Sequence, residues 1–117
     1  QRFKAACAMR SISNFVTSIS TCDKGYLFLL EHMGLNALGG KAHLDESQIL
    51  WDKSPLKYVR NVTTPTLFIH SNTDYRCWMD EPLQMFTSLR QQGVPSKVVL
   101  IHQEATNSTG PAGRSTV

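Results

Sequence analysis

Residues 65–74 read PTLFIHSNTD, and this stretch decides the fold. Residues 66–70 are mostly apolar or β-branched, start after a proline and end in the turn-forming residues 71–74. This pattern predicts a β-strand that leads into a loop. In open sheets of parallel strands, functional residues tend to lie at the carboxyl ends of the strands. We therefore expect the loop after His70 to carry the chemistry of the protein.

Two further strands are expected, one on each side of this stretch in the sequence. Residues 3–9 (FKAACAM) form a short, nearly continuous apolar run, which is typical of a strand buried on both faces of a parallel sheet. Residues 97–101 (KVVLI) have the same character. Beyond residue 103 the chain is rich in Thr, Ser, Gly and Pro without periodicity, so we expect a loose tail over residues 105–117.

The segments between these strands favour helices. Residues 24–33 place apolar side chains on one helical face, and residues 45–58 read as two short helices separated by a turn at Ser54 and Pro55. Residues 11–23 read as a loop.

A further helix is expected after residue 79. Asp80 is predicted to cap it, Leu83, Phe86 and Leu89 to form its inner face, and Gly93 to mark its end.

The order strand, helices, strand, helix, strand predicts an α/β fold with about three parallel strands and flanking helices. A sheet this narrow has two open edges and exposed apolar faces. We therefore expect it to need a neighbour, which is the remainder of a larger domain, another copy of the chain, or a partner chain.

Composition excludes several classes of protein. The chain has 117 residues, 41% of them hydrophobic, which suits one small domain or a piece of a larger one. Its longest apolar run, residues 26–30, is far shorter than the roughly 20 residues of a membrane-spanning helix, and no signal-peptide pattern opens the chain. No membrane is therefore expected as a partner. The net charge of +3 comes from scattered Lys and Arg, so no nucleic acid is expected either.

The cysteines and histidines predict neither a disulfide framework nor a metal site. Cys7, Cys22 and Cys77 contain no CxxC pair, and their odd number favours a reducing compartment, so we expect a cytoplasmic protein. The four histidines are too far apart in the sequence to form a recognisable metal-binding motif. No cofactor is expected.

Three stretches carry a resemblance to a known family. Residues 54–77, SPLKYVRNVTTPTLFIHSNTDYRC, resemble the acid-bearing segment of prolyl oligopeptidase-family serine peptidases, especially the acylaminoacyl-peptidase-like members. Residues 2–15, RFKAACAMRSISNF, are similar to the strand after that family's nucleophile helix, and residues 89–101, LRQQGVPSKVVLI, to its final helix and strand. The resemblance implies that residues 1–104 are the C-terminal part of an α/β-hydrolase peptidase domain.

The resemblance also implies site residues. In this family a Ser attacks the peptide carbonyl, a His transfers the proton and an Asp orients the His, in the chain order Ser, Asp, His. The matching acid is Asp74, which by local sequence alone is equally well explained as a turn-former. Arg76 is expected to hold the loop or to meet a substrate carboxylate, and a surface ion pair is the alternative.

The nucleophile and the base depart from the family pattern. The sequence contains no Gly-x-Ser-x-Gly motif, so the nucleophile is expected in sequence that precedes Gln1. The base should fall near position 106, where Thr106 has no pKa near neutrality. His102 is a candidate base only if the loop has a different register, and is otherwise a structural histidine.

These observations leave three hypotheses. The first is a fragment of a serine peptidase that hydrolyses peptide bonds and is inactive by itself. The second is a non-catalytic α/β module that self-associates or packs on a partner. The third is an esterase or lipase of the same fold, since the fold does not fix the chemistry.

Overall fold

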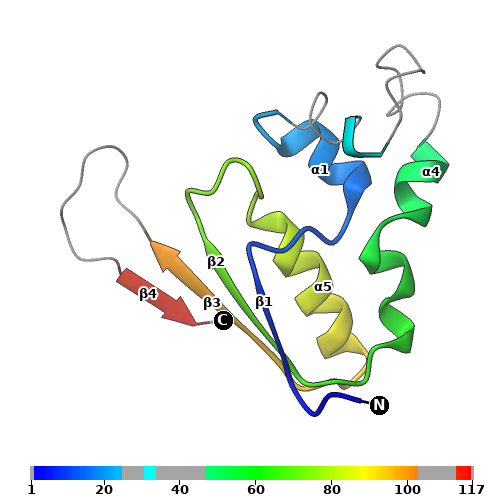
Figure 1. Ribbon diagram of the computed structural model, residues 1–117. Helices are drawn as coiled ribbons and strands as arrows, with labels where there is room; N and C mark the ends of the chain where they lie inside the picture. The colour runs from blue at the N-terminus through cyan, green and yellow to red at the C-terminus, as the bar shows by residue number, and fades with distance from the viewer. Residues whose placement is uncertain (1, 25–30, 34–46, 103–112, 117) are drawn as a thin grey trace.

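The computed structural model describes residues 2–24, 31–33, 47–102 and 113–116. These residues form one sheet with helices on one of its faces (Figure 1). The strand order is β1-β2-β3-β4. The strands are β1 (Ala6–Met9), β2 (Thr66–Ser71), β3 (Ser96–His102) and β4 (Gly113–Thr116).

The first three strands are parallel, as the sequence predicts. β1 pairs with β2 and β2 with β3, so that Met9, Ile69 and Val99 lie side by side in register. The carboxyl ends of all three strands therefore meet at one edge of the sheet, and the loop after β2 starts at the centre of this edge (Figure 1).

Burial of β1 differs from expectation. We expected a strand buried on both faces, but three of its four residues are exposed, and Met9 has 68% of its surface accessible. The reason is position, because in the described part of the chain β1 is an edge strand that pairs only with β2.

β4 lies inside the segment 105–117 for which no regular structure was expected. It pairs antiparallel with β3, and Ile101 lies opposite Arg114. β4 forms because its backbone groups pair with those at the open edge of β3. The side chains of the tail give no sign of this pairing, so the sequence did not predict it.

The helices confirm part of the sequence analysis. Two short helices, α4 (Ser47–Asp52) and η2 (Pro55–Asn61), flank the predicted turn at Ser54. The loop predicted over residues 11–23 was wrong, because α1 (Phe15–Thr21) forms there, with Asn14 Oδ1 accepting from the N–H of Val16 at 3.0 Å. Most of the helix predicted over residues 24–33 lies outside the described residues.

The last helix, α5 (Asp80–Gln91), was predicted with one error. Met79 is the N-cap and Asp80 is the first helical residue, so Asp80 does not cap the helix. Gly93 ends the segment with φ of 78°, a left-handed conformation that glycine adopts without strain. Helix α5 packs on the sheet through a core of Phe68, Leu89, Val94 and Val98.

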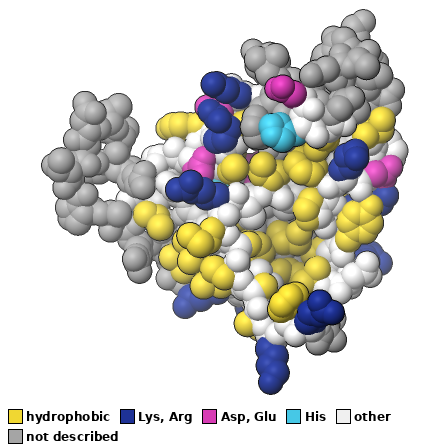
Figure 2. Space-filling view, viewed as in Figure 1, with side chains coloured by type: hydrophobic (Ala, Val, Ile, Leu, Met, Phe, Trp, Pro, Cys, Tyr) yellow, Lys and Arg dark blue, Asp and Glu magenta, His cyan; other side chains and the backbone are white. Residues whose placement is uncertain are grey.

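The opposite face of the sheet carries the alternate side chains. Phe68 and Val98 point into the core beneath α5, so Leu67, Ile69 and Val99 point to the other side. Figure 2 shows hydrophobic side chains gathered over the strands on this face. None of the helices in the described residues is long and apolar enough to cross a membrane.

Candidate functional site

The loop of residues 72–77, which we call the acid loop, connects the carboxyl end of β2 to the segment before α5. Asp74 folds this loop on itself, because its Oδ1 accepts hydrogen bonds from the N–H groups of Arg76 at 3.0 Å and Cys77 at 2.9 Å. The backbone N–H of Asp74 donates to the carbonyl of Ser71 at 3.4 Å. The carboxylate is therefore half-buried and fixed at the carboxyl edge of the sheet.

One oxygen of Asp74 is left over. Both loop hydrogen bonds use Oδ1, and among the described residues no donor reaches Oδ2. A carboxylate oxygen can accept more than one hydrogen bond, so Asp74 can orient a ring N–H that approaches from a neighbouring loop.

His102 lies at the end of β3, at the same edge of the sheet as Asp74. It is exposed, and its Nδ1 accepts from the side-chain amide of Asn72 at 2.8 Å. The hydrogen bonds of the described residues do not join His102 to Asp74. Thr106, the residue at the expected base position, lies outside the described residues.

Arg76 ties the acid loop to the end of α1. Its Nε donates to Asp23 Oδ1 at 2.6 Å and its Nη2 to Asp23 Oδ2 at 3.3 Å. The N–H of Asp23 in turn donates to the carbonyl of Tyr75 at 2.9 Å. The hydrogen bond from Arg76 holds the pKa of the exposed Asp23 carboxyl below its ordinary value of 3.8. Arg76 thus forms the surface ion pair that the sequence left as an alternative.

Two aromatic rings stack where the acid loop ends. Tyr75 and Trp78 stack with ring centroids 5.2 Å apart and an interplanar angle of 28°. Cys77, which precedes Trp78 in the sequence, is partly buried, and burial raises the pKa of its thiol above the ordinary value of 9.0. A thiol in this state is a poor nucleophile at neutral pH.

Glu81 is a structural residue that the sequence analysis missed. It is fully buried, and its Oε2 accepts from the N–H groups of Ser13 at 3.0 Å and Asn14 at 2.8 Å, while its Oε1 accepts from Thr17 Oγ1 at 2.7 Å. Burial raises the pKa of the Glu81 carboxyl, although these hydrogen bonds act in the opposite direction. Glu81 therefore fixes the first turn of α1 to the start of α5.

Ser13 and His70, which follow or end a strand, both make structural contacts. Ser13 Oγ is buried and donates to the carbonyl of Glu81 at 2.5 Å, which marks it as structural. His70 is buried beneath the acid loop, where its Nε2 contacts the carbonyl oxygen of Cys77. A polar residue at the end of an apolar strand was the only sequence signal for His70.

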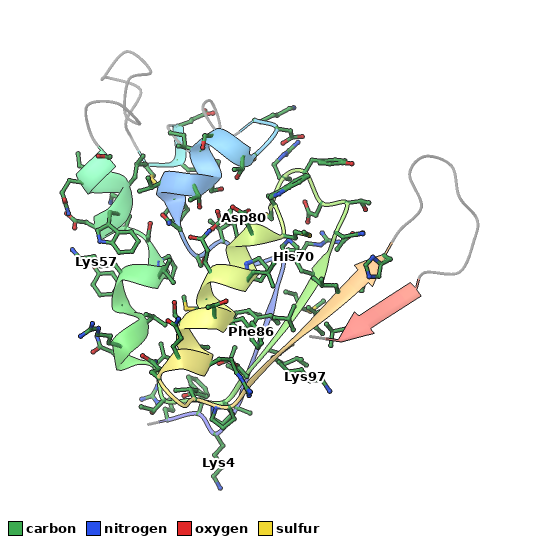
Figure 3. The ribbon with its side chains drawn as sticks, turned by 180° about the vertical axis from the view of Figure 1, so that it is seen from behind. Lys4, Lys57, His70, Asp80, Phe86 and Lys97 are labelled. Carbon is green, nitrogen blue, oxygen red and sulfur yellow. The ribbon has the colours of Figure 1, made fainter. Side chains whose placement is uncertain are left out.

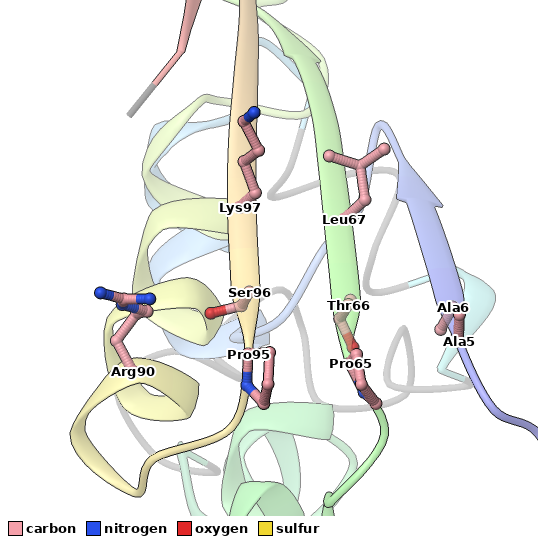
Figure 4. A pocket seen from close by; sticks show the side chains of 9 residues that line it. All are labelled: Ala5, Ala6, Pro65, Thr66, Leu67, Arg90, Pro95, Ser96 and Lys97. Carbon is pink, nitrogen blue, oxygen red and sulfur yellow. The ribbon is translucent and has the colours of Figure 1, made fainter.

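A surface hollow of about 410 Å³ lies at the other end of the sheet. It is lined by residues at the amino ends of β2 and β3, among them Pro65, Thr66, Pro95 and Lys97 (Figure 4). Because parallel strands place their carboxyl ends at the opposite edge, this hollow is not part of the site around Asp74. The described residues contain no group of three or more His, Cys, Asp or Glu side chains that could hold a metal ion.

Comparison with known proteins gives the family. The model of the prolyl oligopeptidase family matches residues 1–107. A Bacillus subtilis (strain 168) protein described as the uncharacterized peptidase YuxL is 40% identical over 101 residues, which are 84% of this chain and 14% of that protein. Acylamino-acid-releasing enzyme 1 of Oryza sativa subsp. japonica is 27% identical over 87% of this chain and 14% of its own length.

Solved structures agree with the sequence comparison. The structure of Pyrococcus horikoshii acylaminoacyl peptidase superposes with a TM-score of 0.72 at 33% identity, covering 88% of this chain and 16% of that one. The chain thus spans about one seventh of the length of the relatives that it matches. Its three parallel strands and flanking helices correspond to part of an α/β-hydrolase fold. The chain belongs to the prolyl oligopeptidase family of serine peptidases.

Proposed function

We propose that this chain is the acid-bearing part of the catalytic domain of a serine peptidase, and that Asp74 is the acid of its triad. The observation that carries the proposal is the geometry of Asp74. Its Oδ1 is occupied by the N–H groups of Arg76 and Cys77, and its Oδ2 remains available to a ring nitrogen at the carboxyl edge of the sheet. The family match over residues 1–107 supports this assignment.

The proposed reaction is peptide-bond hydrolysis through an acyl-enzyme. A serine attacks the carbonyl, a histidine carries the proton to the leaving amine, and Asp74 orients and charges the imidazole. No Gly-x-Ser-x-Gly motif occurs in the 117 residues, so the serine comes from sequence outside them. The names of relatives that release acylamino acids or dipeptides favour substrates cleaved near their N-termini.

His102 does not fit the role of base in its observed contacts. A triad histidine donates from Nδ1 to the acid, whereas Nδ1 of His102 accepts a hydrogen bond from Asn72. We therefore assign the acid alone to the described part of the chain, and Thr106 at the base position leaves the histidine to be supplied from elsewhere.

The partner that we propose is the remainder of a hydrolase domain. Among the described residues one edge of β1 is unpaired and Leu67, Ile69 and Val99 are only partly buried, and the relatives are about seven times longer. Covering both would satisfy the open strand edge and remove apolar surface from water. The three free cysteines favour a cytoplasmic location.

A chimera tests the proposal. Residues 2–102 of this chain replace the matching segment of the Pyrococcus horikoshii acylaminoacyl peptidase, which supplies the rest of the domain. We expect the chimera to hydrolyse chromogenic peptide substrates and to lose this activity with Asp74→Asn. An Asp74→Asn chimera with unchanged turnover would remove Asp74 from the triad. Parallel assays with ester substrates separate a peptidase from an esterase or lipase of the same fold.

The second candidate function is a non-catalytic module that associates with a copy of itself. The observation in its favour is the exposed edge around β1, where Phe3 is 70% and Met9 68% accessible. Light scattering of the purified chain distinguishes the two. A discrete dimer that is abolished by Met9→Lys favours this candidate, and a monodisperse monomer counts against it.

A further inference from the structure

His70 lies beneath the acid loop without any role in the proposed chemistry. It is the fifth residue of β2, only 2% exposed, and Figure 3 shows it close to Asp80 at the start of α5. Burying an imidazole is costly unless its polar atoms find partners. Its contacts therefore indicate why a histidine, rather than an apolar residue, is found here.

The ring makes one hydrogen bond among the described residues. Nε2 contacts the carbonyl oxygen of Cys77, while Nδ1 is buried and has no hydrogen-bond partner in the described part of the chain. A carbonyl oxygen can only accept, so the ring proton is on Nε2. Nε2 is thus the donor of this hydrogen bond.

Cys77 joins this imidazole to Asp74. Its N–H donates to Asp74 Oδ1 at 2.9 Å, and its carbonyl accepts from His70. His70 is itself held in the central strand β2, opposite Leu100 of β3. The hydrogen bonds therefore run from a strand paired on both sides to the carboxylate at the tip of the acid loop.

The side-chain bonds that join the acid loop to β3 and to the end of α1 are more exposed. Asn72 binds the exposed His102. The ion pair of Arg76 with Asp23 has both side chains accessible to water by more than 40%. Exposed pairs contribute little to rigidity, because solvent screens them and the side chains lose entropy. The bond from the buried side chain of His70 is thus the stronger restraint on the loop.

We propose that His70 is the positioning residue of Asp74, which it holds in place through the carbonyl of Cys77. The proposal rests on the proposed function in one respect, since it takes Asp74 as the triad acid. Loss of the imidazole leaves the carbonyl of the partly buried Cys77 without its donor, and the loop moves to hydrate it. A displacement of about 1 Å of a catalytic group is enough to lower turnover strongly.

The test reads the release of the acid loop through the thiol of Cys77. The full 117-residue chain carries Cys7→Ser, which removes the exposed thiol, and the alkylation rate of Cys77 by iodoacetamide is followed by peptide mass spectrometry. His70→Leu removes the donor, and His70→Gln places an amide N–H near the position of Nε2. Phe68→Leu is the matched control, because Phe68 is equally buried on the same face of β2 but does not contact Cys77 through a hydrogen bond.

We expect His70→Leu to raise the alkylation rate of Cys77 about tenfold, the factor that corresponds to the loss of one hydrogen bond. His70→Gln should restore the rate to within about threefold of the parent, and Phe68→Leu should remain in the same range. Equal rates for His70→Leu and Phe68→Leu would overturn the proposal.

A second measurement needs no variant and decides the matter if His70→Leu does not fold. Long-range ¹H–¹⁵N NMR spectra of the parent chain report which ring nitrogen of His70 carries the proton. A ring that carries a proton on Nε2 supports the proposal, and a ring protonated on Nδ1 alone contradicts it.

The outcomes separate this proposal from the proposed function. If His70 does not position Asp74, Cys77 stays protected from alkylation in His70→Leu, while Asp74→Asn still abolishes turnover of the chimera. If the acid role is wrong, Asp74→Asn retains turnover while His70→Leu still exposes Cys77.

Discussion

Two carboxylates seven residues apart, Asp74 and Glu81, are used in opposite ways. Glu81 is fully buried, and both of its oxygens accept hydrogen bonds from the region around α1. Asp74 is half-buried, and only its Oδ1 is occupied, by N–H groups of its own loop. A carboxylate whose oxygens are both satisfied by the protein holds the fold together, whereas one with a spare oxygen can orient a partner.

The largest expected effect separates the two residues by activity. In the chimera, Asp74→Asn should lower kcat about 10⁴-fold, because an amide imposes the wrong tautomer on the histidine, while the melting temperature stays close to that of the parent. Glu81→Gln should lower the melting temperature and leave kcat per folded molecule unchanged. Turnover assays and thermal melts on the same samples check this, and a loss of kcat in Glu81→Gln alone would break the comparison.

The next effect concerns stability. Glu81→Ala leaves the N–H groups of Ser13 and Asn14 buried without an acceptor, so we expect the free energy of unfolding to fall by about 3 kcal/mol. Urea unfolding followed by circular dichroism measures it. Asp52→Ala, which removes an exposed carboxylate, is the control. A loss no larger than that of the control would mean that Glu81 does not hold α1 to α5.

A smaller effect follows from the pKa of Glu81. Burial raises this pKa above its ordinary value of 4.5, so the folded chain binds the proton more tightly than the unfolded chain. The contribution of the titrating carboxyl to stability is therefore greatest below pH 4.5 and declines as the pH rises through the higher pKa of the folded state. The difference in melting temperature between the parent and Glu81→Gln should shrink accordingly. A difference that grows with pH would show that the folded pKa is lowered.

The smallest expected effect concerns Arg76. Because both members of its pair with Asp23 are exposed, Arg76→Ala should change the melting temperature no more than Lys57→Ala, which breaks the exposed pair of Lys57 with Asp52. Added salt should reduce the change further. A clearly larger loss of stability would show that the ion pair, and not the bond from the buried side chain of His70, restrains the acid loop.

The sequence predicted those helices and strands whose formation follows from a local pattern of apolar side chains. The apolar run of β2 and the spacing of Leu83, Phe86 and Leu89 in α5 are local signals, and both elements formed where expected. Helix α1 was missed because its sequence, FVTSIST, is rich in β-branched and hydroxyl residues that favour strands or loops by propensity. Its stabilising contact with Glu81 spans 64 residues and leaves no local trace.

The candidate site, too, was predicted only where local sequence carried the signal. Asp74 was found through a resemblance of its flanking residues, and its position after a strand was a local prediction. The roles of Glu81 and His70 depend on which backbone groups the fold brings to them, and no spacing in the sequence reports these contacts. Burial of β1 was mispredicted because it depends on what lies beside the strand.

The most direct test of the central claim uses the purified chain alone. It is treated with a serine-directed phosphonate, read by intact mass, and assayed with chromogenic peptide and ester substrates. If the chain supplies the acid and not the nucleophile, neither label nor turnover will be detected. Turnover together with a labelled serine would contradict the account and would move the search for the triad to the serines of the chain itself.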